Sequence, residues 1–387
     1  MLIRDTNIKI DMDKCIACGI CVDRCIMDNL RLSVAPCRQG CPLHLNCQGY
    51  IRLLANKDKN NIFKTMEAAL PFIGIIGKVC HAPCEKACAR SRVDAPVPIR
   101  GLSQYITDND STYLQLASRI NTKQTGKKAA VLGSGPAGLM AAWQLCKKGH
   151  HVQLFDAKDQ LEGQYMTTCH PLDISSREAK RIIRAIADSG VIFDVLTEKK
   201  PLNFEEMTKS YDAIIITTKA HMDHSWLPKD CMTDDGEFLI ESRNFQFKTQ
   251  NSFFLAKEAK TEKPLFINAL ASGKNAAESA DQYLSGMQVE WGRGFGEASG
   301  NVKECSPPFH RTKNKSCGQQ KKDLIQSIKN QKKNRTVFTQ NDAIFHAKRC
   351  LGCGRPFDAN ATCWYCLPCE IECPYGALEV KIPYLVR

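Results

Sequence analysis

The spacing of its cysteines constrains this chain more than any other feature. The pattern C-x2-C-x2-C-x3-C occurs near each end, and at the second occurrence a proline follows. Three closely spaced thiols on a tight loop can hold one face of a cuboidal iron–sulfur cluster, and this spacing is the bacterial ferredoxin one. Structural zinc, the alternative, usually takes two well-separated ligand pairs. The motifs therefore predict [4Fe–4S] ligands at Cys15, Cys18, Cys21 and Cys25 and at Cys363, Cys366, Cys369 and Cys373.

Composition restricts the class of protein further. The chain has 387 residues, more than one hydrophobic core usually serves, so we expect two or three domains. No apolar run is long enough to span a bilayer, and "MLIRDTNIKIDMDK" contains no signal-peptide core, so we expect a cytoplasmic protein without a membrane span. In that reducing compartment, 21 cysteines indicate metal binding rather than disulfides.

The net charge of +12 is unevenly distributed. Between Lys303 and Arg335 there are ten basic and two acidic residues, so most of the excess belongs to one segment. This distribution argues against a nucleic-acid partner. The segment is interpreted either as a solvated tether or as a docking site for an acidic partner such as ferredoxin.

A dinucleotide fingerprint lies in the middle of the chain. In "VLGSGPAGLMAAW" a strand-like run leads into three glycines spaced G-x-G-x-x-G, a helical run follows, and the next strand-like run ends in an aspartate. Such glycines let backbone N–H groups approach a pyrophosphate at a helix N-terminus, and the aspartate accepts hydrogen bonds from a ribose. The predicted cofactor-binding residues are Gly133, Gly135, Pro136, Ala137, Gly138 and Asp156.

The patterns divide the chain into five parts. Strand-like runs at 129–132, 152–155 and 213–217 alternate with helical runs, as in an α/β domain. The predicted fold class is a multidomain α/β plus α protein with a Rossmann-type FAD-binding domain, a helical iron–sulfur domain and ferredoxin-like segments at both ends. The expected parts are a ferredoxin-like segment (1–33), a helical iron–sulfur domain (34–120), a Rossmann-like domain (127–286), a basic linker (287–340) and a second ferredoxin-like segment (341–387).

A further set of cysteines fills the second part. "PCRQGCP" contains Cys37 and Cys41, and "VCHAPCEKAC" contains Cys80, Cys84 and Cys88. Together these strings resemble the N-terminal helical domain of the glutamate synthase small subunit and its relatives, including dihydropyrimidine dehydrogenase. The resemblance implies two [4Fe–4S] clusters in this domain, one of them bound by Cys37, Cys41, Cys80 and Cys88.

The chain departs from that family at the second cluster. The usual C-x2-C pair upstream of Cys37 is missing, and Ser103 or Gln104 stands near the usual glutamate or glutamine. One source of partners for Cys84 is the loop from Cys15 to Cys25. Another is "AKRCLGCG", which resembles the string that opens the family's domain and contributes Cys350 and Cys353. Cys47 is the weakest candidate, because relatives often have an aliphatic residue there. We expect three clusters, and four if all sixteen clustered cysteines are ligands.

The same resemblance identifies the dinucleotide as FAD. "YDAIIITTKA" resembles the family's strand that ends in Ala-Thr-Gly, and the implied cofactor-binding residues here are Thr218, Lys219 and Glu258. Lys219 replaces a glycine, and Lys257 lies where relatives have Gly-Gly-Asp. These lysines either contact phosphate or mark a site that no longer binds the flavin. The residues from Lys219 to Pro264 are too few for the family's NADPH domain, so NAD(P)H binding by that route is not expected.

These features predict an electron-transfer subunit of a larger anaerobic oxidoreductase complex. Its three to four [4Fe–4S] clusters and FAD would relay electrons between a carrier such as ferredoxin and a separate catalytic oxidoreductase subunit. No acid–base set and no nucleophile with a partner is recognisable, so an independent NAD(P)H-dependent enzyme is not expected. Two alternatives stay open: a ferredoxin-dependent flavin reductase in its own right, and an iron–sulfur wire on a scaffold whose FAD site has decayed.

Overall fold

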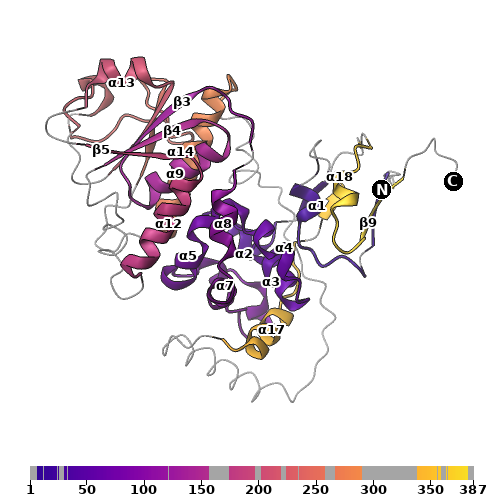
Figure 1. The fold of residues 1–387 in the computed structure, drawn as a ribbon. Helices are drawn as coiled ribbons and strands as arrows, with labels where there is room; N and C mark the ends of the chain where they lie inside the picture. Colours follow the sequence, from indigo (N-terminus) through magenta and orange to yellow (C-terminus); the bar gives the residue numbers. More distant parts are fainter. Residues whose placement is uncertain are drawn as a thin grey trace. The chain divides into compact units, whose positions relative to one another are not determined.

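The structure is a computed structural model of the chain, and it forms two compact units (Figure 1). The first unit comprises residues 1–68, 82–106 and 300–387, and the second comprises residues 69–81 and 107–299. The predicted cofactor residues Lys219 and Glu258 and most of the basic linker lie outside the described residues. The described residues are 7–11, 13–23, 25, 30–32, 34–120, 122–156, 174–196, 202–218, 224–233, 235–257, 266–289, 338–354, 356–358, 363 and 365–381.

Both terminal segments contribute to one part of the first unit. Strand β1 (Ile8–Ile10) pairs antiparallel with β9 (Leu378–Val380), with Ile8 opposite Val380. Strand β2 (Leu30–Leu32) pairs in the same way with β8 (Pro356–Asp358). The helices α1 (Ile20–Asp23) and α18 (Pro368–Ile371) lie side by side, indigo beside yellow in Figure 1. The two cysteine motifs, far apart in sequence, therefore share one small module, whose core contains Ile8, Cys21, Leu30, Cys369, Leu378 and Val380.

The other described elements of the first unit are helices, and proline starts several of the short helices of this unit. Pro36, Pro83 and Pro368 each occupy the first turn of a helix, where a missing N–H costs nothing, and a cysteine follows each of them. Gly40 lets α2 approach α6, since a Cβ there would lie 2.9 Å from the Ala87 Cβ. The elements are α2 (Pro36–Gln39), α3 (Cys47–Ala55), α4 (Lys59–Thr65), α6 (Pro83–Lys86), η2 (Ala89–Arg92) and α17 (Gln340–Lys348). Both η1 (Glu67–Phe72) and α7 (Ile99–Asn109) continue from the first unit into the second.

The second unit contains a five-stranded parallel sheet in the order β5-β4-β3-β6-β7. This is the doubly wound order 3-2-1-4-5, in which the strand order reverses between β3, the first strand in sequence, and β6. The predicted α/β domain is confirmed, with the runs at 129–132, 152–155 and 213–217 as central strands. The strands are β3 (Lys128–Leu132), β4 (His151–Asp156), β5 (Ile192–Val195), β6 (Ala213–Thr217) and β7 (Phe253–Ala256).

Apolar residues cover both faces of this sheet. On one face, Leu132 and Ile216 pack with Phe247 and Phe253 in a fully buried core. Helices α9 and α14 pack against each other and against the sheet, and a Cβ at Gly273 would lie only 2.0 Å from the Ala137 carbonyl oxygen. The helices are α5 (Ile73–Val79), α8 (Thr112–Ser118), α9 (Pro136–Lys147), α12 (Ser176–Asp188), α13 (Phe204–Ser210), η3 (Lys229–Cys231) and α14 (Phe266–Leu284).

None of the helices in the described ranges combines the length and the apolar character needed to cross a bilayer.

Candidate functional site

The two terminal cysteine loops share left-handed backbone at two matching positions. Directly before the second cysteine of each motif, Ala17 and Tyr365 have φ angles of 60° and 57°. Directly after it, Gly19 and Leu367 have φ angles of 85° and 66°. Left-handed backbone is unfavourable for residues other than glycine, so its recurrence at matching positions indicates that the loop shape is imposed by the site.

Backbone N–H groups also approach the fourth thiol of each motif alike. The N–H of Leu30 donates to Cys25 Sγ over 3.4 Å, and the N–H of Ala377 donates to Cys373 Sγ over 3.4 Å. Such N–H···S bonds stabilise thiolates and raise the potential of a cluster bound to them. The two halves of the module therefore share these two left-handed positions and this N–H contact to the fourth sulfur.

The fourth cysteine of each motif lies with the first three of the other. One pocket is lined by Cys15, Cys18 and Cys21 together with Cys373. Around Cys369, the thiols of Cys25, Cys363 and Cys366 are close enough to interact electrostatically. Burial and these neighbours raise the pKa of Cys18 and of Cys369 to about 11. This exchange of the fourth ligand is the arrangement of two-cluster bacterial ferredoxins.

A third group of thiols combines residues from both ends of the chain. Cys37, Cys88, Cys350 and Cys353 line one pocket, whose wall includes the apolar side chain of Ile51. Burial raises the pKa of Cys350 to about 12. The resemblance groups Cys37 and Cys88 with Cys41 and Cys80, whereas the structure brings them beside the cysteines of "AKRCLGCG". The C-x2-C pair missing upstream of Cys37 is thus supplied from the other end of the chain.

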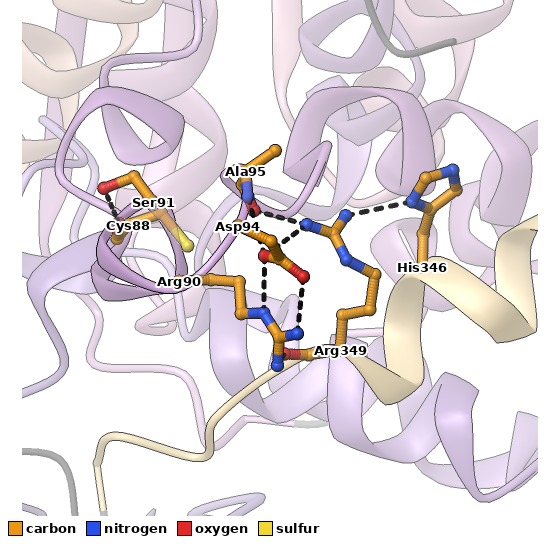
Figure 2. Close-up of polar contacts among 7 residues, drawn as sticks. All are labelled: Cys88, Arg90, Ser91, Asp94, Ala95, His346 and Arg349. Carbon is orange, nitrogen blue, oxygen red and sulfur yellow. Dashed lines mark hydrogen bonds and ion pairs between the residues drawn. The ribbon is translucent and has the colours of Figure 1, made fainter. Parts of the chain in front are cut away.

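An ion-pair network fixes Arg349, the residue directly before Cys350 (Figure 2). The carboxylate of Asp94 accepts hydrogen bonds from Arg90 Nε over 2.7 Å and from Arg349 Nη2 over 2.9 Å. Arg349 also donates to the Ala95 carbonyl oxygen, and Arg90 Nη1 donates to the carbonyl oxygen of Arg349 over 3.2 Å. Burial alone would raise the pKa of Asp94, but the hydrogen bonds from the two arginines outweigh it and lower that pKa well below its ordinary value. The residue before Cys350 is therefore fixed by both its side chain and its backbone.

The same network includes a buried histidine. His346 is 3% exposed, and its Nδ1 lies 3.1 Å from Arg349 Nη1, which donates to it. Burial and the neighbouring arginine charge lower the pKa of His346 to about 4. A neutral imidazole can accept from the guanidinium, whereas a protonated one would oppose it.

Helix α3 contacts the loops of two thiol groups. The Asn46 side chain, at its N-cap, donates to the Cys18 carbonyl oxygen. Arg52 Nε donates to the Ile16 carbonyl oxygen over 3.2 Å, and Gln48 Nε2 donates to that of Gly354 over 3.3 Å. One helix thus binds the backbone of the Cys15–Cys21 loop and of the segment that follows Cys353.

Sequence reasoning missed the position of one thiol at the start of α3. The Cys47 side chain hydrogen-bonds with those of Cys37, Cys41 and Cys84, and it is 2% exposed. Its only sequence signal is that it completes an even count of clustered cysteines. Cys80, the C-cap residue of α5, is buried in the second compact unit, and its role as a ligand stays a prediction.

Among the residues that the structure describes, no three His, Cys, Asp or Glu side chains surround a point that could hold a single metal ion. In a cubane each thiolate binds a different iron, so the ligands surround a body rather than a point. The donor set fits that chemistry, because thiolates are the ligands that hold iron–sulfur clusters.

The predicted dinucleotide turn connects β3 to α9. Gly133 has a φ of 106°, and a Cβ there would lie 2.0 Å from Thr217 Oγ1. A Cβ at Gly138 would lie 1.8 Å from the Gly133 carbonyl oxygen. Gly135 is the N-cap of α9, and Pro136 opens the helix. The turn therefore requires glycine for steric reasons, and its helix N-terminus stands at the carboxyl end of the central strand, where open α/β sheets bind nucleotides.

Asp156 stabilises this turn as well as ending β4. Its Oδ2 accepts hydrogen bonds from the Ser134 N–H over 2.6 Å and from Ser134 Oγ over 2.8 Å. Nearby, the Thr218 N–H donates to the Ala256 carbonyl oxygen over 3.3 Å. The described members of the predicted cofactor set therefore lie at the carboxyl ends of the adjacent strands β3, β4 and β6 and in the first turn of α9, and their arrangement fits a dinucleotide phosphate.

Comparison with known protein families supports both kinds of site. Residues 4–114 match the family described as dihydropyrimidine dehydrogenase domain II, 4Fe-4S cluster. Residues 131–197 match the NAD(P)-binding Rossmann-like domain. The predicted resemblance and the predicted fold class are thereby confirmed.

Individual relatives are oxidoreductase subunits or chains. The chain is 30% identical over 213 residues to the NADP(+)-dependent formate dehydrogenase subunit beta of Moorella thermoacetica, which covers 48% of this chain and 30% of that protein. It is 30% identical over 182 residues to the glutamate synthase [NADPH] small chain of Bacillus subtilis, covering 47% and 37%. It is 28% identical over 191 residues to the NADPH-Fe(3+) oxidoreductase subunit beta of Geobacter sulfurreducens strain DL-1 / KN400, covering 48% and 28%. The chain thus spans less than two-fifths of each of these relatives.

Proposed function

We propose that this chain is an electron-transfer subunit of a larger anaerobic oxidoreductase complex. In this proposal, [4Fe–4S] clusters and FAD relay electrons between a carrier such as ferredoxin and a separate catalytic subunit. Bound clusters would supply one-electron steps, and the flavin would connect them to two-electron chemistry. The relatives support the general class of function, because their names describe subunits or chains of oxidoreductases.

The observation that carries the proposal is the exchange of the fourth cysteine between the two terminal motifs. Cys373 lies with Cys15, Cys18 and Cys21, and Cys25 lies with the thiols around Cys369. This exchange brings two cluster sites close together within one small module. Closely spaced centres suit electron transfer better than a purely structural role, for which one site would be enough.

The chain's own residues prepare the sites for this task. Left-handed residues occur at matching positions in each loop, and N–H groups from Leu30 and Ala377 contact the fourth thiols. The apolar core of the module buries Cys21 and Cys369. Solvent exposure and hydrogen bonds to sulfur are two of the means by which a protein sets the reduction potential of a cluster.

For the flavin, the supporting observation is the turn from Gly133 to Gly138. Its glycines let the turn close tightly, because a Cβ would collide with Thr217 at Gly133 and with the Gly133 carbonyl oxygen at Gly138, and Asp156 fixes the turn through Ser134. The identity of the dinucleotide as FAD rests on the resemblance. A wire built on a scaffold without flavin is the alternative, and the experiment below separates the two.

The test is the content of iron, acid-labile sulfide and released flavin in protein purified without oxygen. We expect about twelve to sixteen iron atoms per chain, four for each cubane, and one FAD. Iron at this level without flavin would support the relay of iron–sulfur clusters and contradict the proposal that the chain binds FAD. Iron below about four atoms per chain would contradict the relay itself.

A further inference from the structure

We infer that the Arg52 guanidinium is shared by two cluster sites and raises the reduction potentials of both. The inference rests on the proposed function, since it concerns clusters of the same relay. It assigns a role to a side chain that no motif includes, and it makes the two sites neighbours in the relay. The sites are the first-motif pocket, lined by Cys15, Cys18, Cys21 and Cys373, and the third group of thiols, Cys37, Cys88, Cys350 and Cys353.

One side chain contacts the backbone of both sites. Arg52 Nε donates to the Ile16 carbonyl oxygen over 3.2 Å, and Arg52 Nη1 donates to the Cys350 carbonyl oxygen over 3.5 Å. Ile16 lines the first-motif pocket, and Cys350 lines the pocket of the third group. Gly352 lies against the same side chain, since a Cβ there would be 3.9 Å from Arg52 Nε. The guanidinium therefore connects two loops whose thiols line different pockets.

The helix that carries Arg52 is held close to the first-motif loop. Its N-cap residue, Asn46, donates from its side chain to the Cys18 carbonyl oxygen and accepts from the Gly49 N–H over 3.1 Å. Gly49 is needed for this approach, because a Cβ there would lie 2.6 Å from the Cys18 carbonyl oxygen. At the other site, Gln48 of the same helix lines the pocket of the third group. The position of Arg52 between the two sites is thus set by contacts of α3 that do not involve the Arg52 side chain.

The charge of Arg52 is not neutralised by a neighbouring carboxylate. None of the ion pairs within the described ranges includes this half-buried side chain. By contrast, Arg90 and Arg349 share the carboxylate of Asp94. A partly buried charge is screened by solvent and salt less than an exposed one. A cluster gains one negative charge when it is reduced, so a nearby unneutralised positive charge favours the reduced form and raises the potential.

The shared side chain also places the two sites next to each other. Two carbonyl oxygens that accept from one guanidinium are separated only by the width of that group and its two hydrogen bonds. Electron transfer slows steeply with distance, so sites connected in this way suit direct exchange of electrons. Each exchange would oxidise the cluster at one site and reduce the cluster at the other by one electron. The third group would therefore be joined to the terminal module through its first-motif pocket.

The first test replaces Arg52 with glutamine, which is neutral, and with lysine, which keeps the charge, in the full chain purified without oxygen. We expect Arg52→Gln to keep its iron and to have more negative midpoint potentials at two clusters. In Arg52→Lys both potentials should lie closer to those of the wild type. Redox titration followed by electron paramagnetic resonance measures the potentials. Cys15→Ser and Cys353→Ser identify the two signals by their loss.

The matched control is Arg92→Gln, at an exposed arginine of η2, which should leave all potentials unchanged. A shift of only one cluster in Arg52→Gln would overturn the sharing. Equal potentials in Arg52→Gln and Arg52→Lys would overturn the role of the charge. Loss of iron from both variants would assign Arg52 a structural role alone, and this result would also overturn the inference.

A second measurement tests the nearness of the two sites without a change at Arg52. In the fully reduced wild type, neighbouring clusters should broaden each other's electron paramagnetic resonance signals. Cys353→Ser, which removes a thiol of the third group, should therefore sharpen the signal of the first-motif cluster. An unchanged signal would overturn the inference but keep the proposed function, because the clusters would still be present. A wild type without iron would reject both.

Discussion

At the scale of single residues, neighbours in sequence are not neighbours in space. Cys25 follows Cys21 by four positions, yet its thiol lies among those around Cys369. Cys373 in turn lines the pocket of the first motif. The C-x2-C-x2-C-x3-C spacing predicts all eight thiols as ligands. It leaves open which thiols share a cluster, because that depends on how the loops meet.

Serine variants test this exchange directly. Replacement of Cys15 or Cys373 by serine should remove or alter the same cluster, and replacement of Cys25 or Cys363 should alter the other. Each change should cost about four irons per chain, and paired spectra of the reduced proteins identify which cluster is affected. Spectra that pair Cys25→Ser with Cys15→Ser would contradict the exchange.

Two glycines with positive φ angles allow two reasons for glycine to be compared: a steric clash with a Cβ, and a left-handed backbone alone. Gly133 has a φ of 106° and no room for a Cβ beside Thr217, whereas Gly126 has a φ of 74° and nothing within 4 Å. We expect Gly133→Ala to lower the free energy of unfolding by about 3 kcal/mol and to abolish bound dinucleotide. Gly126→Ala should cost about 1 kcal/mol and keep the dinucleotide. Denaturant unfolding and cofactor release measure both effects, and equal effects would show that the close contact is unimportant.

At the scale of elements, α17 is fastened to the helical part by charge as well as by its buried alanines, Ala343 and Ala347. Arg349 and Asp94 have side chains that are 6% and 12% exposed, so removal of one leaves the other buried without its full set of partners. Breaking such a pair costs about 3 kcal/mol or more. The contact also fixes the position of Cys350.

Arg349→Met should therefore release the Cys350–Cys353 loop. We expect a loss of about four irons per chain and lower thermal stability, while Arg92→Met, at an exposed arginine of η2, changes neither. Iron content and thermal unfolding are the measurements. A stable Arg349→Met chain with full iron would show that the thiols hold α17 without the ion pair.

The buried histidine of α17 makes stability depend on pH. Its pKa falls from an ordinary 6.5 to about 4 in the folded chain, so the unfolded chain binds the proton more readily. Stability is therefore full above pH 6.5 and decreases as the pH falls toward 4, by roughly 3 kcal/mol. His346→Gln, which can still accept from Arg349, should reduce this dependence, and His151→Gln should not. Denaturant unfolding at several pH values checks the sign, and identical curves for His346→Gln and the wild type would contradict it.

The secondary structure shows what the sequence could predict at this scale. The strands at 129–132, 152–155 and 213–217 are apolar runs beside a glycine fingerprint, and both signals are local. The network of Arg90, Asp94 and Arg349 is absent from any motif, because each charge alone resembles a solvated surface residue. Its partners are more than 250 residues apart, and only the tertiary fold unites them.

At the scale of the whole molecule, the cysteines fall into four sets, and three of these sets include cysteines that follow Phe338 in the sequence. A chain that ends at residue 337 lacks partners for β1 and β2 as well as six cysteines. We expect it to lose about twelve irons, including those of the otherwise intact Cys15–Cys25 loop. Cys373→Ser, as the control, should lose about four. A truncated chain that keeps a cluster on its first motif would show that this motif is self-sufficient.

The two terminal segments form one module that their sequence patterns do not predict. Residues 1–33 and 341–387 each carry a recognisable ferredoxin pattern, and a pattern read along the sequence treats them as separate segments. The structure pairs their strands, β1 with β9 and β2 with β8. Strands of three residues carry almost no periodic signal, so their pairing cannot be predicted from the sequence.

The pairing of β1 with β9 has a consequence for the order of synthesis. A ribosome makes Cys15 long before Cys373, yet both line one pocket. If these thiols bind a cluster, those of the first motif must wait, reduced and unfilled, until Cys373 has been translated. A protein that delivers the cluster would then act on this module only after that point, and a chain interrupted before Cys373 would leave the pocket incomplete.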